Sequence, residues 1–151
     1  MSGDYKEVTY DKFTFKVDQS CLYHPNETWA REEDGLIVVG VTDFLQTNSG
    51  DVAFLEAPEV GAELAQSGEA GIIETIKTTI TLISPLSGTV AEVNPSLADE
   101  PELINSDAYG AGWIMKIKPS NWAAEKDSLL SPDAYFPIME EKVKQVLDSQ
   151  K

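Results

Sequence analysis

The sequence predicts a mostly-β fold with short helices and a C-terminal helix, and three observations support this. Short runs rich in β-branched residues recur between turn signals such as Asp-Gly, Asn-Pro and Ser-Pro. Residues 13–17 alternate apolar and polar side chains, which is typical of a half-buried strand. After residue 131 the apolar residues follow a helical period instead. The 151 residues are most simply one domain, which we divide into an N-terminal extension, residues 1–21, and a main domain, residues 22–151.

The N-terminal third contains strands, a turn and one short helix. Residues 5–17 predict an edge strand or a docking extension. Their end alternates between two faces: Lys12, Thr14 and Lys16 against Phe13, Phe15 and Val17. Pro25-Asn26 predicts a turn, and Trp29 is expected to anchor the core. Asp34-Gly35 predicts a hairpin whose second strand is residues 36–41. Thr42 or Asp43 as N-cap, with Asn-Ser-Gly at 48–50, predicts a short helix.

A faint internal repeat occurs on both sides of the central segment, residues 72–81. Residues 50–60 and 88–97 both start at glycine, run through Val-Ala and break at a proline. They lie on either side of residues 72–81, two β-branched arms whose turn must fall near Lys77. This arrangement indicates two pseudo-symmetric β-units with a central hairpin between them.

The last third combines a closing strand with helices. Residues 113–119 alternate, with Trp113, Met115 and Ile117 expected on one face and Ile114 on the other. Residues 122–130 have a helical pattern, and Ser131-Pro132 is typical of a helix start. We expect Pro137 to interrupt this last helix. Beyond it, four apolar side chains are expected to pack: Ile138, Val143, Val146 and Leu147.

Lys77 is the only basic residue between Glu32 and Met115, in a stretch that contains many acids. A lysine within a β-forming run can simply break up an apolar edge. It can also be an attachment point for a group that is carried between enzymes. A hairpin tip would make its amine mobile and accessible, which suits the second reading.

Composition excludes several classes of function. With 11 basic against 26 acidic residues, the net charge of −15 argues against binding nucleic acid or an anionic membrane. It favours a protein that meets partners with basic surfaces. No apolar run approaches a membrane span, and no export signal opens the chain, so we expect a cytoplasmic protein. A single cysteine, Cys21, and a single histidine, His24, provide neither an internal disulfide nor a cluster of metal ligands.

Several motifs in order resemble the H-protein family of the glycine cleavage system, small lipoyl carriers. Residues 40–46 (GVTDFLQ) resemble the family's Gly-Ile-Thr-Asp-x-Ala-Gln, and residues 50–61 its Gly-Asp strand and Pro-Glu-Val-Gly turn. Glu74-Thr75-Ile76-Lys77 resembles the family's Glu-Ser-Val-Lys lipoylation site. Further matches follow in family order: residues 84–88, 94–95, 101–105 and 109–113. The resemblance extends from about residue 23 to residue 140.

The resemblance implies the fold, the cofactor and the partners. The fold would be a barrel-sandwich hybrid, the β-hammerhead or lipoyl-domain type. Lys77 would carry lipoate in amide linkage, with four flanking residues as its recognition surface: Glu74, Thr75, Ile76 and Thr78. Ile76 and Thr78 stand where related biotin carriers have methionines, which favours lipoate over biotin. The chain would be a monomeric carrier without catalytic residues or metal. Its partners would be a lipoate ligase or lipoate-assembly enzymes, and the enzymes of its pathway.

One departure from the family bears on the cargo. The family reads His-Glu-Trp before the tryptophan, whereas this chain reads Glu27-Thr28-Trp29. The family glutamate is thought to meet the amine of a bound methylamine cargo, so Thr28 removes its countercharge. We therefore favour a lipoate-binding protein beside a heterodisulfide-reductase-like complex that oxidises sulfur compounds. The alternatives are an H-protein that carries aminomethyl groups between glycine cleavage enzymes, and an unmodified interaction domain.

Overall fold

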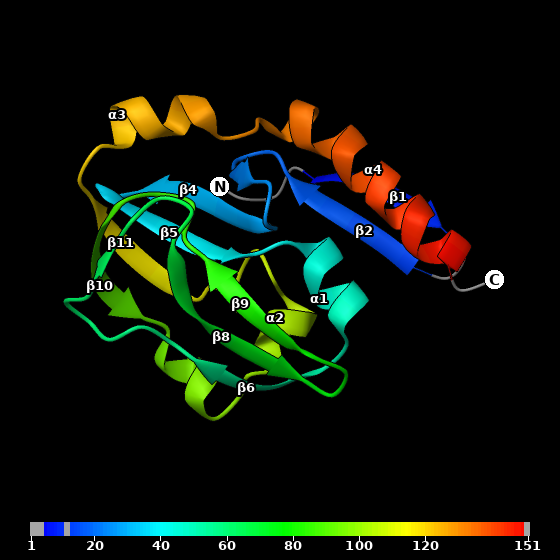
Figure 1. The fold of residues 1–151 in the computed structure, drawn as a ribbon, viewed down its shortest axis with the longest axis horizontal. Helices are drawn as coiled ribbons and strands as arrows, with labels where there is room; N and C mark the ends of the chain where they lie inside the picture. The colour runs from blue at the N-terminus through cyan, green and yellow to red at the C-terminus, as the bar shows by residue number, and fades with distance from the viewer. Residues whose placement is uncertain (1–4, 11–12, 150–151) are drawn as a thin grey trace.

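The computed structural model describes residues 5–10 and 13–149, which form short strands and helices and one long C-terminal helix (Figure 1). In chain order the elements are β1 (Tyr5–Tyr10), β2 (Phe13–Asp18), β3 (Leu22–His24), β4 (Thr28–Glu33), β5 (Leu36–Val41), α1 (Asp43–Ser49), β6 (Val52–Glu56), β7 (Glu63–Leu64), β8 (Glu69–Thr75), β9 (Thr79–Ile83), β10 (Gly88–Val93), the 3₁₀ helix η1 (Pro95–Ala98), α2 (Leu103–Ser106), β11 (Met115–Pro119), α3 (Trp122–Glu125), the 3₁₀ helix η2 (Lys126–Ser128) and α4 (Pro132–Ser149). The predicted mostly-β class with a C-terminal helix is confirmed.

The strands of the described residues form three sheets. The largest has the order β3-β4-β5-β11-β10-β7, the second has the order β6-β8-β9, and β1 pairs only with β2. All of these pairs are antiparallel. The first two sheets curl towards each other in Figure 1, while α4 lies across the outside of β2 and β3. The two halves of the faint repeat therefore lie in different sheets, β6 in one and β10 in the other.

Apolar side chains form two clusters that match this layering. The first lies between the two larger sheets and includes Ile37, Val39, Ile73, Leu82 and Ile117. The second lies beneath α4 and includes these buried side chains: Phe15, Val17, Tyr23, Trp29, Phe44, Tyr135, Met139 and Val143. Trp29 is fully buried, as expected, and its indole Nε1 donates to the Ala108 carbonyl at 3.2 Å. β4 and β5 contribute to both clusters from opposite faces, since Ile37 and Val39 belong to the first cluster and Val38 to the second.

The local turn and cap predictions are confirmed. Asp34 and Gly35 both have positive φ, 53° and 82°, as the tight turn between β4 and β5 requires. The Thr42 side chain accepts from the Leu45 amide, so Thr42 rather than Asp43 is the N-cap of α1. Local turn chemistry is readable from sequence because it depends on few neighbouring residues.

The expected interruption at Pro137 is wrong, because α4 runs without a break from Pro132 to Ser149. The stripe that packs is Tyr135, Met139 and Val143, each 1% exposed, whereas Ile138 is 40% exposed. The Tyr135 ring also stacks on the Tyr23 ring at 4.4 Å between centroids. A proline removes one helical hydrogen bond. Burial of side chains on both sides of Pro137 offsets that loss and keeps the helix continuous.

The N-terminal hairpin and the closing strand differ in detail from expectation. Phe15 and Val17 are buried, and Phe13 on the same face is 37% exposed. Lys12 lies outside the described residues, and β1 was not expected as a separate strand. β11 begins at Met115, and Ile114 is fully buried rather than on an outer face, because its side chain packs in the first apolar cluster. Among the described residues, no helix has the length and apolarity needed to cross a bilayer.

Candidate functional site

Lys77 lies at the exposed turn between β8 and β9. The Thr75 amide donates to the Thr78 carbonyl at 2.9 Å and closes the turn. The Thr75 hydroxyl oxygen then accepts from the amides of Lys77 and Thr78, at 3.2 and 3.0 Å. Thr75 therefore fixes the backbone of the tip without engaging the Lys77 side chain.

The flanking residues present an exposed surface around the lysine. Glu74 and Thr78 are exposed, Ile76 is 71% exposed, and Thr75 is half-buried. In the described part of the chain, the Lys77 Nζ atom has no hydrogen bond and no ion pair. An exposed amine without a partner fits the chemistry of amide attachment, because a modifying enzyme can reach it and no salt bridge has to break.

The hairpin tip rests on the segment that links α1 to β6. The Ile76 amide donates to the Asp51 carbonyl at 3.0 Å. Gly50 has φ +86° and ψ −172°, a conformation that is essentially restricted to glycine. A Cβ at Gly50 would lie 3.4 Å from Lys77 Cε, so the methylene chain of the lysine passes directly over this glycine.

Asn105 of α2 holds that segment in place. Its Oδ1 accepts from the Val52 amide at 2.8 Å, and its Nδ2 donates to the Gly50 carbonyl at 3.0 Å and to Gln46 Oε1 at 3.1 Å. The motif of residues 101–105 resembles that of the family, but no role for Asn105 was predicted from it. A side chain 28 positions away from the lysine carries no local signal that it supports the lysine tip.

Glu27 and Thr28 are buried near α4. Glu27 lies in the turn between β3 and β4 with φ +70°, and its carboxylate accepts from Thr42 Oγ1 at 2.7 Å, from Lys142 Nζ at 2.6 Å and from the Tyr135 hydroxyl. Thr28 is 1% exposed, and its hydroxyl oxygen has no hydrogen-bond partner in the described chain. The Glu27 carboxylate therefore anchors α4 through Tyr135 and Lys142, and neither Glu27 nor Thr28 presents a free carboxylate at this turn.

His24 and Cys21 have structural surroundings. The His24 Nε2 lies 2.8 Å from Ser67 Oγ, while its Nδ1 accepts from the Asn26 amide, so Nε2 carries the proton in the neutral ring. Burial lowers the pKa of His24. Burial also raises the pKa of the Cys21 thiol to about 12, which keeps it protonated and unreactive near neutral pH. Among the described residues, no three His, Cys, Asp or Glu side chains gather as a metal site would need.

Comparison with known proteins supports the resemblance seen in the motifs. The family model described as "Glycine cleavage H-protein" matches residues 21–142. The chain is 47% identical over 125 residues to the "Glycine cleavage system H protein" of Symbiobacterium thermophilum, covering 83% of this chain and 97% of that protein. It is 41% identical over 135 residues to the "Probable glycine cleavage system H protein" of Aeropyrum pernix, covering 89% and 94%.

A solved structure agrees with the observed fold. The crystal structure of a glycine cleavage system H protein from Mycobacterium marinum superposes with a TM-score of 0.69 at 31% identity, covering 78% of this chain and 94% of that chain. The matched motifs, the fold and the exposed lysine agree with one another. The chain therefore belongs to the glycine cleavage H-protein family, whose members carry lipoate covalently on a lysine and are carrier components rather than enzymes.

Proposed function

We propose that this chain carries lipoate in amide linkage on Lys77 and shuttles aminomethyl groups between the enzymes of glycine cleavage. The observation that carries the proposal is the exposed amine at the tip of the β8–β9 hairpin, within the Glu74-Thr75-Ile76-Lys77 motif, which has no partner among residues 5–10 and 13–149. Its partners are a lipoate ligase or lipoate-assembly enzymes, followed by the glycine cleavage enzymes, in the cytoplasm.

The chain's own residues supply exposure and placement. Lipoate, when bound, supplies a cyclic disulfide that accepts two electrons or holds a cargo on one opened sulfur. Thr75 fixes the turn from within, and Gly50 and Asn105 fix its base, so the attachment point stays rigid. A rigid base beneath a long flexible arm keeps the arm's reach centred on one point.

The relatives favour glycine cleavage over the sulfur-oxidation role expected from Thr28. Nothing among the comparisons supports a heterodisulfide-reductase-like partner, and the named relatives are glycine cleavage system proteins. Thr28 remains the one feature in favour of a sulfur cargo, because neither it nor the engaged Glu27 offers a free carboxylate to an amine. Experiments that load the lipoylated chain with each cargo can distinguish the two functions.

Intact-mass spectrometry tests the attachment site. Incubation with a lipoate ligase, ATP and lipoate is expected to add one lipoyl group to the wild-type chain and none to Lys77→Arg. The control Lys118→Arg changes another exposed lysine and is expected to be modified like the wild type. Modification of Lys77→Arg, or no modification of the wild type by several ligases, would contradict the proposal.

A second assay tests the cargo. The lipoylated chain, mixed with glycine decarboxylase and glycine, is expected to gain an aminomethyl group on one sulfur of the opened disulfide as CO2 is released. An aminomethyltransferase supplied with a one-carbon acceptor is expected to remove this group, with release of ammonia and a dithiol on the arm. If the lipoylated chain takes up no aminomethyl group but accepts sulfur from a heterodisulfide-reductase-like complex, the sulfur-oxidation alternative holds instead.

A further inference from the structure

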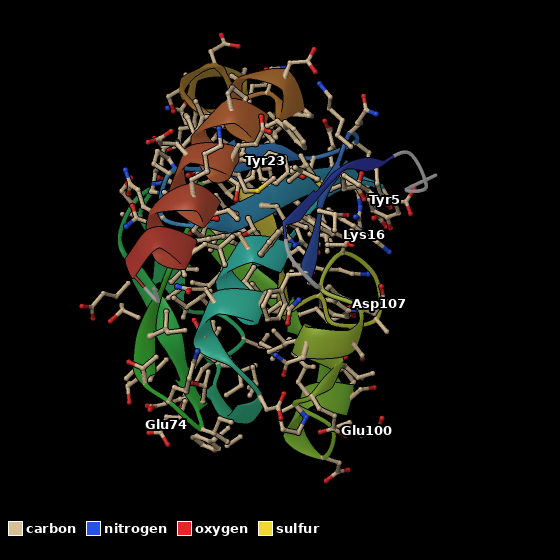
Figure 2. The ribbon with its side chains drawn as sticks, turned by 90° about the vertical axis from the view of Figure 1, so that its right-hand side faces the viewer. Tyr5, Lys16, Tyr23, Glu74, Glu100 and Asp107 are labelled. Atoms are coloured by element: carbon tan, nitrogen blue, oxygen red, sulfur yellow. The ribbon has the colours of Figure 1, made fainter. Side chains whose placement is uncertain are left out.

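A small polar pocket lies between the N-terminal hairpin and the segment that follows α2. Figure 2 shows Tyr5, Lys16 and Asp107 along one side of the molecule, with Glu74 of the β8–β9 hairpin on the other side. The pocket has a volume of about 90 Å³, well below the roughly 300–1,000 Å³ of pockets that bind drug-sized ligands. Seven residues line it: Tyr5, Lys16, Asp43, Ser106, Asp107, Ala108 and Tyr109.

The two walls of the pocket come from different parts of the chain. Tyr5 of β1 and Lys16 of β2 form one wall, and both precede residues 21–142, which match the family model. The Lys16 amide donates to Asp43 Oδ2 at 2.9 Å, and the Tyr109 hydroxyl donates to the Lys16 carbonyl at 2.9 Å. The backbone of Lys16 thus joins the hairpin to the opposite wall, while its side chain takes no part in these bonds.

Three donor groups of the lining are unused within residues 5–10 and 13–149. The Lys16 ammonium makes no ion pair there and lies 5.4 Å from the centroid of the Tyr5 ring. The hydroxyls of Tyr5 and Ser106 have no hydrogen-bond partner in the same segments. Burial, followed by the nearby carboxylates of Asp18 and Asp107, raises the pKa of Tyr5, so its hydroxyl keeps its proton.

Two carboxylates supply the acceptors. Asp107 Oδ2 accepts from the Ala111 amide at 2.8 Å, whereas its Oδ1 has no donor in the described chain. Asp43 Oδ1 accepts from Gln46 Nε2 at 2.7 Å, and its Oδ2 accepts from the Lys16 amide. Each carboxylate oxygen can accept more than one hydrogen bond, so both aspartates keep capacity for a further donor.

This combination of charges selects the kind of ligand. A simple anion would meet two carboxylates, and a divalent cation would meet the Lys16 ammonium, so each is repelled by part of the lining. A zwitterion satisfies both signs, because its carboxylate can face Lys16 while its ammonium faces Asp43 and Asp107. Hydrogen bonds between charged groups are also stronger than neutral ones.

We propose that this pocket binds a small zwitterionic α-amino acid, of which glycine is the smallest. The carboxylate of the ligand accepts from Lys16, Tyr5 and Ser106, and its ammonium donates to the two aspartates. The ligand thereby bridges the N-terminal hairpin and the body of the molecule, and its binding stabilises the docked hairpin. This site is independent of lipoylation at Lys77, so its failure would leave the carrier function intact.

The first test is a titration of the unmodified full-length chain, followed by the NMR shifts of its backbone amides at constant ionic strength. Glycine is expected to shift the amides of Lys16 and Ser106 with half-saturation at about 1–10 mM, a range typical of so small a ligand at an open site. The Gly68 amide, at a turn that does not line the pocket, is expected to stay in place.

Acetate and methylamine each carry one of the two charges of glycine, and both are expected to bind at least tenfold more weakly. Binding of acetate or methylamine as tight as that of glycine would overturn the proposal, because one charge would then suffice. A glycine titration that shows no saturation, or whose largest shifts lie away from the pocket, would also overturn it.

The second test removes one charge at a time. Lys16→Met and Asp107→Asn are each expected to weaken glycine binding at least tenfold. Both changes preserve the local structure, since Lys16→Met keeps both backbone hydrogen bonds and Asp107→Asn keeps an oxygen for the Ala111 amide. Unchanged binding in either variant would contradict the assignment.

Lys118→Met and Asp99→Asn are the matched controls. They make the same changes at exposed side chains that do not line the pocket, and both are expected to bind glycine like the wild type. Tyr5→Phe keeps the ring that packs on Tyr109 and removes only the hydroxyl, so a severalfold loss is expected. An equal loss in the controls would show that glycine responds to overall charge instead of this pocket.

Discussion

The chemistry of this chain depends on how a few residues hold one lysine. Thr75 closes the hairpin turn, and Gly50 lies beneath the lysine methylenes in a conformation that other residues resist. Asn105 joins both sides of the Gly50 segment through three hydrogen bonds. The position of the lysine is thus set by backbone geometry and by one amide side chain, and no ion pair to Lys77 occurs within the described segments.

Gly50→Ala is expected to lower the free energy of unfolding by about 1–3 kcal/mol, because alanine is strained at φ +86° and ψ −172°. It is also expected to slow lipoylation, since relief of this backbone strain would shift the segment on which Ile76 and Lys77 rest. Urea unfolding and intact-mass time courses measure the two effects. Gly35→Ala is the control, because Gly35 also has positive φ but no atom near its Cβ position. Equal lipoylation rates in both variants would refute a role for Gly50 at the tip.

His24 is expected to make stability fall as the pH drops below about 7. Burial lowers its pKa in the folded chain. As the pH falls through the unfolded value of about 6.5, the unfolded chain takes up a proton that the folded chain does not, so stability falls. Thermal unfolding of the wild type should therefore show a larger loss of Tm over this range than His24→Gln, whose amide can still donate to Ser67. Parallel Tm curves for the two proteins would disprove this role.

At the scale of elements, α4 shows how packing overrides a local signal. The helix continues through Pro137 because Tyr135, Met139 and Val143 are buried at intervals of four residues. The Glu27 carboxylate adds a second anchor, since it accepts from Tyr135 and Lys142 of the same helix. Burial raises the pKa of Tyr135, so its hydroxyl stays a donor at all ordinary pH values.

Pro137→Ala is expected to stabilise the protein by about 1–2 kcal/mol. Alanine restores a helical N–H and is about 3 kcal/mol better than proline inside a helix, while the unfolded chain gains back up to about 1 kcal/mol of entropy. Chemical denaturation measures the change. Pro132→Ala is the control, because a proline at the first helical position loses no hydrogen bond and its replacement should change little. A stabilisation of Pro132→Ala equal to that of Pro137→Ala would contradict this reasoning.

At the scale of the whole molecule, charge is the dominant feature. A net charge of −15 over 151 residues destabilises the folded state through self-repulsion. The described chain contains only a few ion pairs, and most have an exposed partner, so they offset little of this repulsion. The same charge favours partners whose docking surfaces are basic.

Sodium chloride is therefore expected to raise the Tm by a few degrees between low salt and about 0.5 M, because screening lengths shorten well below the size of the protein. Chloride is the informative anion, since sulfate also stabilises proteins through exclusion from their surface. A Tm that stays constant or falls with sodium chloride would show that repulsion is not a significant cost in this fold.

The sequence alone determined the fold class, the hairpin turn at Asp34-Gly35, the N-cap of α1 and the place of Lys77 at an exposed tip. Each of these follows from period, turn chemistry or a short motif, which are properties of neighbouring residues. The division into residues 1–21 and 22–151, the monomeric state and the recognition surface around Lys77 stay predictions. Only the tertiary structure decided that Glu27 is buried against α4, that α4 passes through Pro137, and that Phe13 and Leu147 meet beside Lys77. These outcomes depend on the packing of segments far apart in the chain, and local sequence patterns carry no record of such contacts.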